Sequence, residues 1–211
     1  LERRYELLER ANQHDFLIIE DDYESETNFK GTPIPALKSL DKHDRVLYVG
    51  SLSKTLAPGL RVGYLVGPEA LIREARALRR LMVRHPAANN QRSVALFLER
   101  GYHDALIMSL MRAYEERHQQ MGAALREYLP ESSQEPSFGG SCYWVKGPDG
   151  LDARRLQGEA AEHGILIEPG DIHFFGEQPP LNYFRLGYSS IPAERIRPGI
   201  KLLAELIHQI S

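Results

Sequence analysis

The chain has 211 residues, of which 42% are hydrophobic and 26% are charged, a balance typical of a globular protein with one or two domains. Its formal net charge of −3 gives no electrostatic support for nucleic-acid binding by this segment. The single cysteine, Cys142, excludes an internal disulfide and fits a reducing, cytoplasmic compartment. No apolar run reaches the roughly 20 residues that a transmembrane helix needs.

The first part of the sequence alternates helical and strand-like segments. Residues 1–13 predict an amphipathic helix, and residues 69–83 carry apolar side chains at helical spacing. Short apolar runs at 16–20, 46–50 and 62–66 predict buried strands. Because strands alternate with helices, this part is predicted to be α/β with a mainly parallel sheet.

The second part mixes strands and helices in a smaller unit of the α+β class. A long helical stretch from about 91 to 128 leads into it, with a predicted break near Gly101. Later elements are predicted at 141–145, 152–163, 165–168, 183–187 and 192–210. We place the domain boundary inside the long helical stretch, so that the first domain spans 1–96 and the second spans 97–211.

A lysine-containing loop follows the second predicted strand, in the sequence Gly-Ser-Leu-Ser-Lys-Thr at 50–55. Ser51 and Ser53 can donate to phosphate oxygens, and Arg61 can close on the same phosphate with a bidentate contact. Partial burial of Lys54 would favour the neutral amine that forms an imine. Taken alone, this short motif is more often a solvated loop lysine, and the companion motifs of serine-nucleophile enzymes are absent.

An acidic cluster, Glu-Asp-Asp-Tyr at 20–23, ends the first predicted strand. Ligands of such sheets gather at the carboxyl ends of strands, so Asp21 and Lys54 can face one crevice. A buried carboxylate needs a cationic partner, and a pyridinium nitrogen is one candidate. Tyr23 could donate to a phenolate-type oxygen on the same ring. In isolation, a turn or helix-capping cluster is the favoured interpretation of these acids.

Arg185 lies inside the apolar strand predicted at 183–187. An unpaired arginine there costs several kcal/mol, so it needs an anion. An internal carboxylate and a substrate carboxylate are about equally plausible, and a planar guanidinium suits either. Asp171 and His173 are interpreted as loop residues, and Trp144 as a core residue of the second unit.

Together these features resemble the fold-type I enzymes that use pyridoxal phosphate (PLP), the aminotransferase class I/II family. The match follows the order of the motifs over nearly the whole chain. The resemblance implies PLP as the cofactor, held by Lys54 as a Schiff base (an internal aldimine). It also implies contacts of Asp21 with the pyridine nitrogen, Tyr23 with the ring hydroxyl, Ser51, Ser53 and Arg61 with the phosphate, and Arg185 with a substrate carboxylate.

Within that family the chain most resembles the MocR-like branch of GntR-type regulators, through residues 18–26, 48–61 and 165–171. Those proteins join an N-terminal winged helix-turn-helix to an aminotransferase-like domain. The resemblance implies amino-group transfer between amino acids and 2-oxo acids, or a catalytically silent sensor of PLP or amino compounds. A third alternative is an α/β binding domain without PLP.

The chain begins without Met and inside a helical pattern, so we expect it to be the C-terminal part of a longer protein. The resemblance further implies a homodimer at full length and a small amino-acid or amine substrate. Contact with DNA is expected only through an upstream domain, and none is expected with a membrane.

Overall fold

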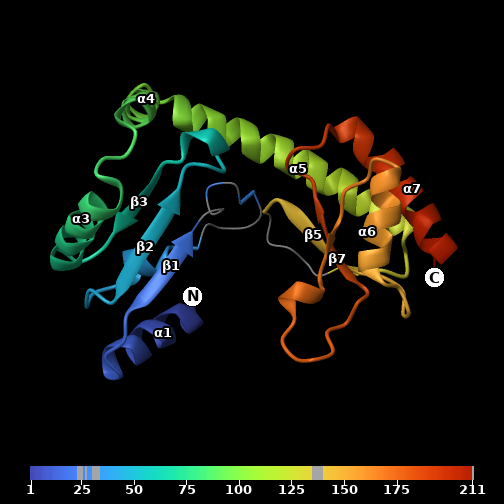
Figure 1. Cartoon of the computed structure of the whole chain (residues 1–211), viewed down its shortest axis with the longest axis horizontal. Coiled ribbons are helices and arrows are strands. Elements are labelled where there is room, and N and C mark those ends of the chain that lie inside the picture. Colours follow the sequence, from blue (N-terminus) through green and yellow to red (C-terminus); the bar gives the residue numbers. More distant parts are fainter. Residues whose placement is uncertain (23–25, 27, 30–33, 135–139, 211) are drawn as a thin grey trace. The chain divides into compact units, whose positions relative to one another are not determined.

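The computed structural model describes residues 1–211 except 23–25, 27, 30–33, 135–139 and 211 (Figure 1). The chain divides into two compact units, residues 1–109 and 110–211. This division falls further along the chain than residue 96, where the sequence places the end of the first domain. The family-level boundary at that residue stays a prediction.

The first unit contains a three-stranded sheet with helices before, between and after its strands. In chain order its elements are α1 (Glu2–Gln13), β1 (Ile18–Asp22), α2 (Leu37–Leu40), β2 (Val46–Ser51), the 3₁₀ turn η2 (Pro58–Leu60), β3 (Gly63–Val66), α3 (Glu69–Val83) and α4 (Ala88–Glu99). The prediction of an α/β first part is confirmed.

The strand order is β1-β2-β3, and these three strands form a mixed sheet. β1 runs parallel to β2, with Asp22 opposite Gly50, whereas β3 runs antiparallel to β2, with Gly63 opposite Ser51. A parallel pair needs a long crossover, and the chain between β1 and β2 includes α2. The segment 52–62 returns the chain directly, so β3 pairs in the opposite direction.

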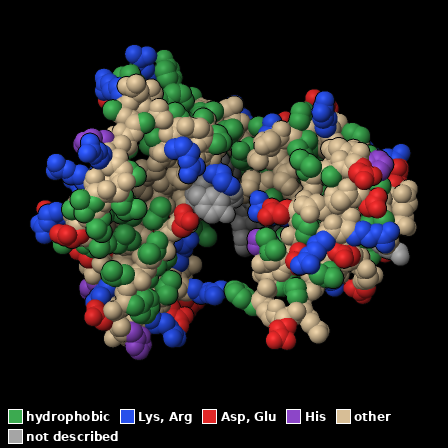
Figure 2. Space-filling model, viewed as in Figure 1, with side chains coloured by type: hydrophobic (Ala, Val, Ile, Leu, Met, Phe, Trp, Pro, Cys, Tyr) green, Lys and Arg blue, Asp and Glu red, His purple; other side chains and the backbone are tan. Residues whose placement is uncertain are grey.

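Large apolar side chains of the first unit remain exposed on both the sheet and a helix. All four residues of β3 are exposed, and Ile19 of β1 is 73% exposed. In α3, Leu81 and Met82 are more than 80% exposed. Hydrophobic side chains accordingly gather on the surface of this unit in Figure 2. Contiguous exposed apolar surface of this kind is typical of sites that contact another protein segment.

The second unit is a four-stranded antiparallel sheet with helices packed on one face. Its elements are the C-terminal part of α5 (Tyr102–Tyr128), then β4 (Ser133–Gln134), β5 (Cys142–Lys146), α6 (Ala153–Glu162), β6 (Glu168–Pro169), the 3₁₀ turn η3 (Asp171–His173), β7 (Tyr183–Gly187) and α7 (Ala193–Ile210). The strand order is β4-β5-β7-β6. This arrangement confirms the predicted α+β class.

Alternation along the strands separates the two faces of this sheet. Tyr143 and Val145 of β5, with Phe184 and Leu186 of β7, are buried. The residues between them form the opposite face, which is only partly covered. The core of the unit is completed by apolar side chains of α5, α6 and α7, among them Leu125, Leu156, Leu203 and Ile207.

Local helix signals were predicted correctly. α4 and α5 are separated at Gly101, which has φ of +69°. Asp152 caps α6 by accepting hydrogen bonds from the backbone N–H of Arg154 (2.9 Å) and of Arg155 (3.4 Å). Gly164, with φ of +76°, follows that helix in the left-handed conformation that glycine tolerates. Among the described residues, no helix is both long and apolar enough to span a membrane.

Candidate functional site

The loop that follows β2 carries the predicted lysine. Its two ends lie side by side, because Ser51 and Gly63 are opposite each other in the β2–β3 pair. Leu52 donates its backbone N–H to Val62 O (3.1 Å), which closes the loop. Ser53 donates its backbone N–H to the hydroxyl of Ser51 (3.3 Å). The short closure explains why hydroxyl groups and Lys54 are concentrated at the end of one strand.

The predicted burial of Lys54 is wrong, because its side chain is exposed in this structure. The lysine lies in a turn beyond the end of the strand, where Leu52 and Thr55 take the buried positions. These neighbours anchor the turn and leave Lys54 on its outer side. The amine is therefore accessible to a ligand, although the desolvation expected from the sequence is absent in this unit.

Thr55 offers an independent sign that the loop is built for a ligand. Its side chain is 5% exposed, and its Oγ1 has no hydrogen-bond partner among the described residues. A buried hydroxyl without a partner costs free energy, and such groups often occur at functional sites. Together with the hydroxyls of Ser51 and Ser53, it makes the donor set of the loop suitable for the phosphate ester of PLP.

Arg61 ends the turn η2 in a conformation that is unusual for its type. Its φ and ψ are 50° and 44°, in the left-handed region that costs a residue other than glycine about 1 kcal/mol or more. The turn is held by Asn90 of α4, which donates from Nδ2 to Leu60 O (3.0 Å). The exposed Arg61 side chain and Lys54 thus belong to one closed loop, as the predicted phosphate site requires.

The acidic cluster at the end of β1 divides into residues with different partners. Glu20 accepts hydrogen bonds from the backbone N–H groups of Leu37 (2.7 Å) and Lys38 (2.9 Å), at the N-terminus of α2. Its carboxylate also pairs with Arg4 Nη1 at 3.2 Å. The helix-capping interpretation therefore applies to Glu20, which joins α1, β1 and α2.

Asp22 and Asp21 point to different faces, as neighbours in a strand must. Asp22 accepts a hydrogen bond from the hydroxyl of Tyr48 (2.9 Å). Burial, followed by that contact with Asp22 and by Tyr64, raises the pKa of the Tyr48 hydroxyl well above its usual value. Asp21 is exposed and makes no hydrogen bond or ion pair with the other described residues, so its carboxylate is available to a ligand.

The parallel pairing places Asp21 at the same edge of the sheet as the lysine loop, because Asp21 lies opposite Val49. A hollow of about 990 Å³ between α1, β1 and the start of α2 is lined by Asp21, Asp22 and Tyr48, among other residues. Neither Lys54 nor Arg61 is among its lining residues. The convergence of Asp21, Lys54 and Arg61 on one ligand therefore stays a prediction, and Tyr23 lies outside the described residues.

In the second unit, Arg185 has an internal carboxylate beside it. Its Nε lies 3.3 Å from Oε2 of Glu168, and the two side chains are 39% and 45% exposed. The two residues are opposite each other in the β6–β7 pair. Sequence reasoning left this partner open, because it depends on the register of strands that are distant in sequence.

Trp144 was predicted to pack in the core of the second unit, and this is wrong. It projects from the partly covered face of the sheet, where it lies opposite Arg185 in the β5–β7 pair. Its indole ring stacks on Tyr183 with a centroid distance of 5.7 Å and meets the rings of His173 and Phe174 at 5.6 and 6.0 Å. Arg185 is thus next to an aromatic cluster on an accessible face.

Asp171 lies in η3, and its side chain is buried and paired. It accepts a hydrogen bond from Arg154 Nε (3.0 Å) and also contacts Arg154 Nη2. The hydrogen bond from Arg154 holds the pKa of Asp171 below its usual value. This pair fixes η3 against the first turn of α6. Among the described residues, no group of three His, Cys, Asp or Glu side chains could hold a metal ion.

Comparison with known proteins places these features in a family. Residues 2–201 match the family model for aminotransferase class I and II. The HTH-type transcriptional regulator TauR of Rhodobacter capsulatus is 42% identical over 98% of this chain and 43% of its own length. Aromatic-amino-acid aminotransferase 1 of Thermococcus litoralis is 34% identical over 98% of this chain and 50% of its own length.

Solved structures of aminotransferases support the same family. The multiple substrate aminotransferase of Thermococcus profundus superposes with a TM-score of 0.90 at 35% identity, over 99% of this chain and 52% of that one. The kynurenine aminotransferase of Pyrococcus horikoshii gives 0.89 at 32% identity, with the same coverage of 99% and 52%. The chain therefore spans about half the length of the relatives that it matches. It belongs to the aminotransferase class I and II family, whose cofactor is pyridoxal phosphate.

Proposed function

We propose that this chain is part of an aminotransferase-like domain in a MocR-like regulator, that Lys54 holds PLP covalently, and that the domain transfers amino groups between amino acids and 2-oxo acids. The observation that carries this proposal is the set of groups found at one edge of the first sheet. There an accessible carboxylate, an accessible amine and a loop of hydroxyl groups follow paired strands. A cationic ring that carries a phosphate and an aldehyde has a use for each of these three groups.

Each of these residues has a defined task in the proposal. Ser51, Ser53 and Arg61 hold the phosphate of the cofactor. Asp21 keeps the pyridine nitrogen protonated, and bound PLP then supplies an electron sink for substrate carbanions. Lys54 attaches the cofactor and, once a substrate amine has displaced it, moves a proton as general base and acid.

Two residues complete the proposed set. Tyr23 would donate to the ring hydroxyl of the cofactor, as the family resemblance implies. Arg185 would bind the carboxylate of the amino-acid substrate, for which a guanidinium offers two parallel donors. The accessible position of Arg185 on its sheet supports this role.

A second candidate function is a sensor without turnover, in which PLP and an amino compound control DNA binding by another domain. The identity of 42% with a transcriptional regulator, higher than the 34% with an aminotransferase, favours this candidate. Both candidates use the same residues, so the presence of a site does not decide between them. Assays of turnover on amino acid and 2-oxo acid pairs separate the two, because only the first candidate predicts amino-group transfer.

The cofactor assignment is tested with the full-length protein and two lysine variants. Lys54→Ala is expected to lose the visible absorbance of bound PLP, because the covalent attachment is gone. Lys42→Ala is the matched control, since Lys42 is another exposed lysine of the first unit. Retention of an unchanged visible band in Lys54→Ala would show that the proposal is wrong. Light scattering on the same protein tests the expected homodimer.

A further inference from the structure

The ion pair between Arg185 and Glu168 has a geometry that leaves part of the arginine available. Glu168 approaches Nε of the guanidinium, 3.3 Å from its Oε2, on one side of the fork. The edge formed by Nη1 and Nη2 can bind a carboxylate with two parallel hydrogen bonds. A carboxylate at Nε therefore does not block the edge that a ligand needs.

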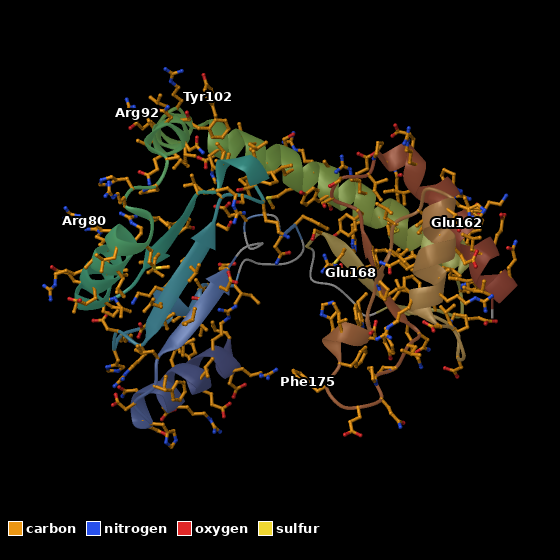
Figure 3. The ribbon with its side chains drawn as sticks, viewed as in Figure 1. Arg80, Arg92, Tyr102, Glu162, Glu168 and Phe175 are labelled. Carbon is orange, nitrogen blue, oxygen red and sulfur yellow. The ribbon has the colours of Figure 1, made fainter. Side chains whose placement is uncertain are left out.

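Glu168 is itself held in place from several directions. Glu168 is labelled in Figure 3. It is opposite Arg185 in the β6–β7 pair, and its Oε1 lies 3.8 Å from Nε2 of His173. The chain beyond it is fixed because Gly170 donates its backbone N–H to Tyr183 O (2.8 Å). A side chain at Gly170 would collide with Trp144, since an added Cβ would lie 2.5 Å from the indole ring. Close packing here limits the freedom of Glu168.

The surroundings of the Arg185–Glu168 pair suit binding of a ligand better than stabilisation of the fold. Both side chains are 39–45% exposed, and an ion pair with that exposure contributes at most about 1 kcal/mol to folding. Arginine on a strand has several flexible torsions, and a neighbour that restricts them lowers the entropy cost of ligand binding. Trp144 lies opposite Arg185 in the neighbouring strand, on the same face of the sheet.

We propose that Glu168 is a positioning residue: it holds Arg185 through Nε so that the Nη1–Nη2 edge accepts the carboxylate of an amino-acid ligand. Glu168 thereby makes the site prefer amino acids over amines that lack a carboxylate. This inference rests on the proposed function, because it assigns to Arg185 the ligand's carboxylate. If Glu168 instead competed with the ligand carboxylate for Arg185, removal of Glu168 would raise the preference for amino acids rather than lower it.

The experiment measures the preference of full-length, PLP-loaded protein for amino acids over their decarboxylated counterparts. Three pairs serve as probes: L-leucine with 3-methylbutylamine, L-phenylalanine with 2-phenylethylamine, and L-alanine with ethylamine. Dissociation constants come from the change in cofactor absorbance on titration. The ratio within a pair cancels any general loss of cofactor or of folded protein, which a merely structural role would cause.

Glu168→Ala is expected to reduce the preference by about two- to fivefold, while Glu168→Gln retains most of it. The retained preference is expected because glutamine keeps a partially negative oxygen at the position that lies 3.3 Å from Nε in the wild type. Arg185→Ala is the reference for complete loss. An unchanged ratio in Glu168→Ala, with loss in Arg185→Ala, overturns the positioning role and leaves the proposed function intact. A higher ratio in Glu168→Ala overturns it in favour of competition.

The remaining outcomes are also decisive. If the wild type binds PLP but prefers no amino acid over its amine in any pair, the role of Arg185 and with it the inference are overturned. The cofactor assignment survives that result. If the wild type binds no PLP, the proposed function itself fails, which the cofactor absorbance reports before any titration begins.

Discussion

The substitution Asp41→Asn tests how the lysine-bearing strand is anchored at its other end. Asp41 follows α2, and its side chain is only 2% exposed. It accepts hydrogen bonds from the backbone N–H of Val46 (2.9 Å), the first residue of β2, and of His43 (3.0 Å). Lys38 Nζ also donates to it at 3.2 Å. One carboxylate therefore joins the end of α2 to the start of β2.

The size of the expected destabilisation follows from the hydrogen bonds that an asparagine amide cannot accept. One of the two oxygens becomes an N–H₂ group, so one backbone N–H loses its acceptor, at a cost of about 1–3 kcal/mol when that group is buried. Val46 is fully buried. Loss of the ion pair between Asp41 and Lys38 adds up to about 1 kcal/mol. The expected decrease in the free energy of unfolding is therefore about 1–4 kcal/mol.

Urea denaturation of the full-length protein, followed by circular dichroism at pH 7, measures this decrease. Asp44→Asn is the matched control, because Asp44 lies 3.6 Å from the same Lys38 but is 77% exposed. Its φ of 55° is a conformation that asparagine tolerates, so a change below about 0.5 kcal/mol is expected. An Asp41→Asn midpoint and slope equal to those of the wild type would refute the anchoring role.

The dependence of this effect on pH gives a second check. Burial alone would raise the pKa of Asp41, but the backbone N–H donors and Lys38 outweigh burial and lower it. A folded-state pKa below the unfolded value of 3.8 means that the contribution to stability is complete above that value. It disappears as the pH falls through the folded-state pKa. The difference between wild type and Asp41→Asn should therefore shrink below pH 3.8.

Two further substitutions test the packing around the proposed sites. Gly63→Ala would place a Cβ 2.8 Å from the backbone oxygen of Gly50, so we expect a loss of about 1–3 kcal/mol in urea denaturation and weaker PLP binding. Gly59→Ala, with no atom within 4 Å of the added Cβ, is the control and should be near neutral. Asp171→Asn should lower the calorimetric melting temperature at pH 7, and less so below pH 3.8, because Arg154 stabilises the ionised carboxyl. Equal shifts at both pH values would contradict that reasoning.

Signals confined to a few neighbouring residues predicted the fold well. The break at Gly101 and the cap at Asp152 depend on backbone conformation and on hydrogen bonds within one turn, which residue type alone indicates. Apolar runs predicted the approximate positions of β1, β2, β3, β5 and β7. They gave no sign of β4, and the run predicted at 165–168 forms a strand only from Glu168 onward. The family followed from the order of several motifs, each of which is weak alone.

Properties that depend on distant parts of the chain were not predictable in the same way. An apolar run at 62–66 indicates a strand but not its direction, which is set by the short connection 52–62. Alternation around Trp144 separates two faces but does not show which one is covered by helices. The pair of Glu168 with Arg185 depends on the register of two strands that the sequence leaves free. These are consequences of tertiary structure rather than of local preference.

The acidic cluster at 20–23 contains one feature that local sequence predicted and others that depend on tertiary structure. Sequence reasoning placed Asp21 at the carboxyl end of a strand, and the parallel pairing bears out that position. It did not separate the capping role of Glu20 from the contact of Asp22 with Tyr48, which depend on α2 and β2. The alternation of side chains along β1 was the available signal, since it places Asp21 on the face opposite to both.

The most direct test of the account is to identify the lysine that carries the cofactor. Borohydride reduction of the full-length, PLP-loaded protein converts a reversible lysine–cofactor linkage into a stable secondary amine, and peptide mapping by mass spectrometry locates it. The account predicts modification of Lys54 and none of the other lysines of this chain, which are Lys30, Lys38, Lys42, Lys146 and Lys201. An unmodified Lys54, with the cofactor absent or attached to a different lysine, would contradict it.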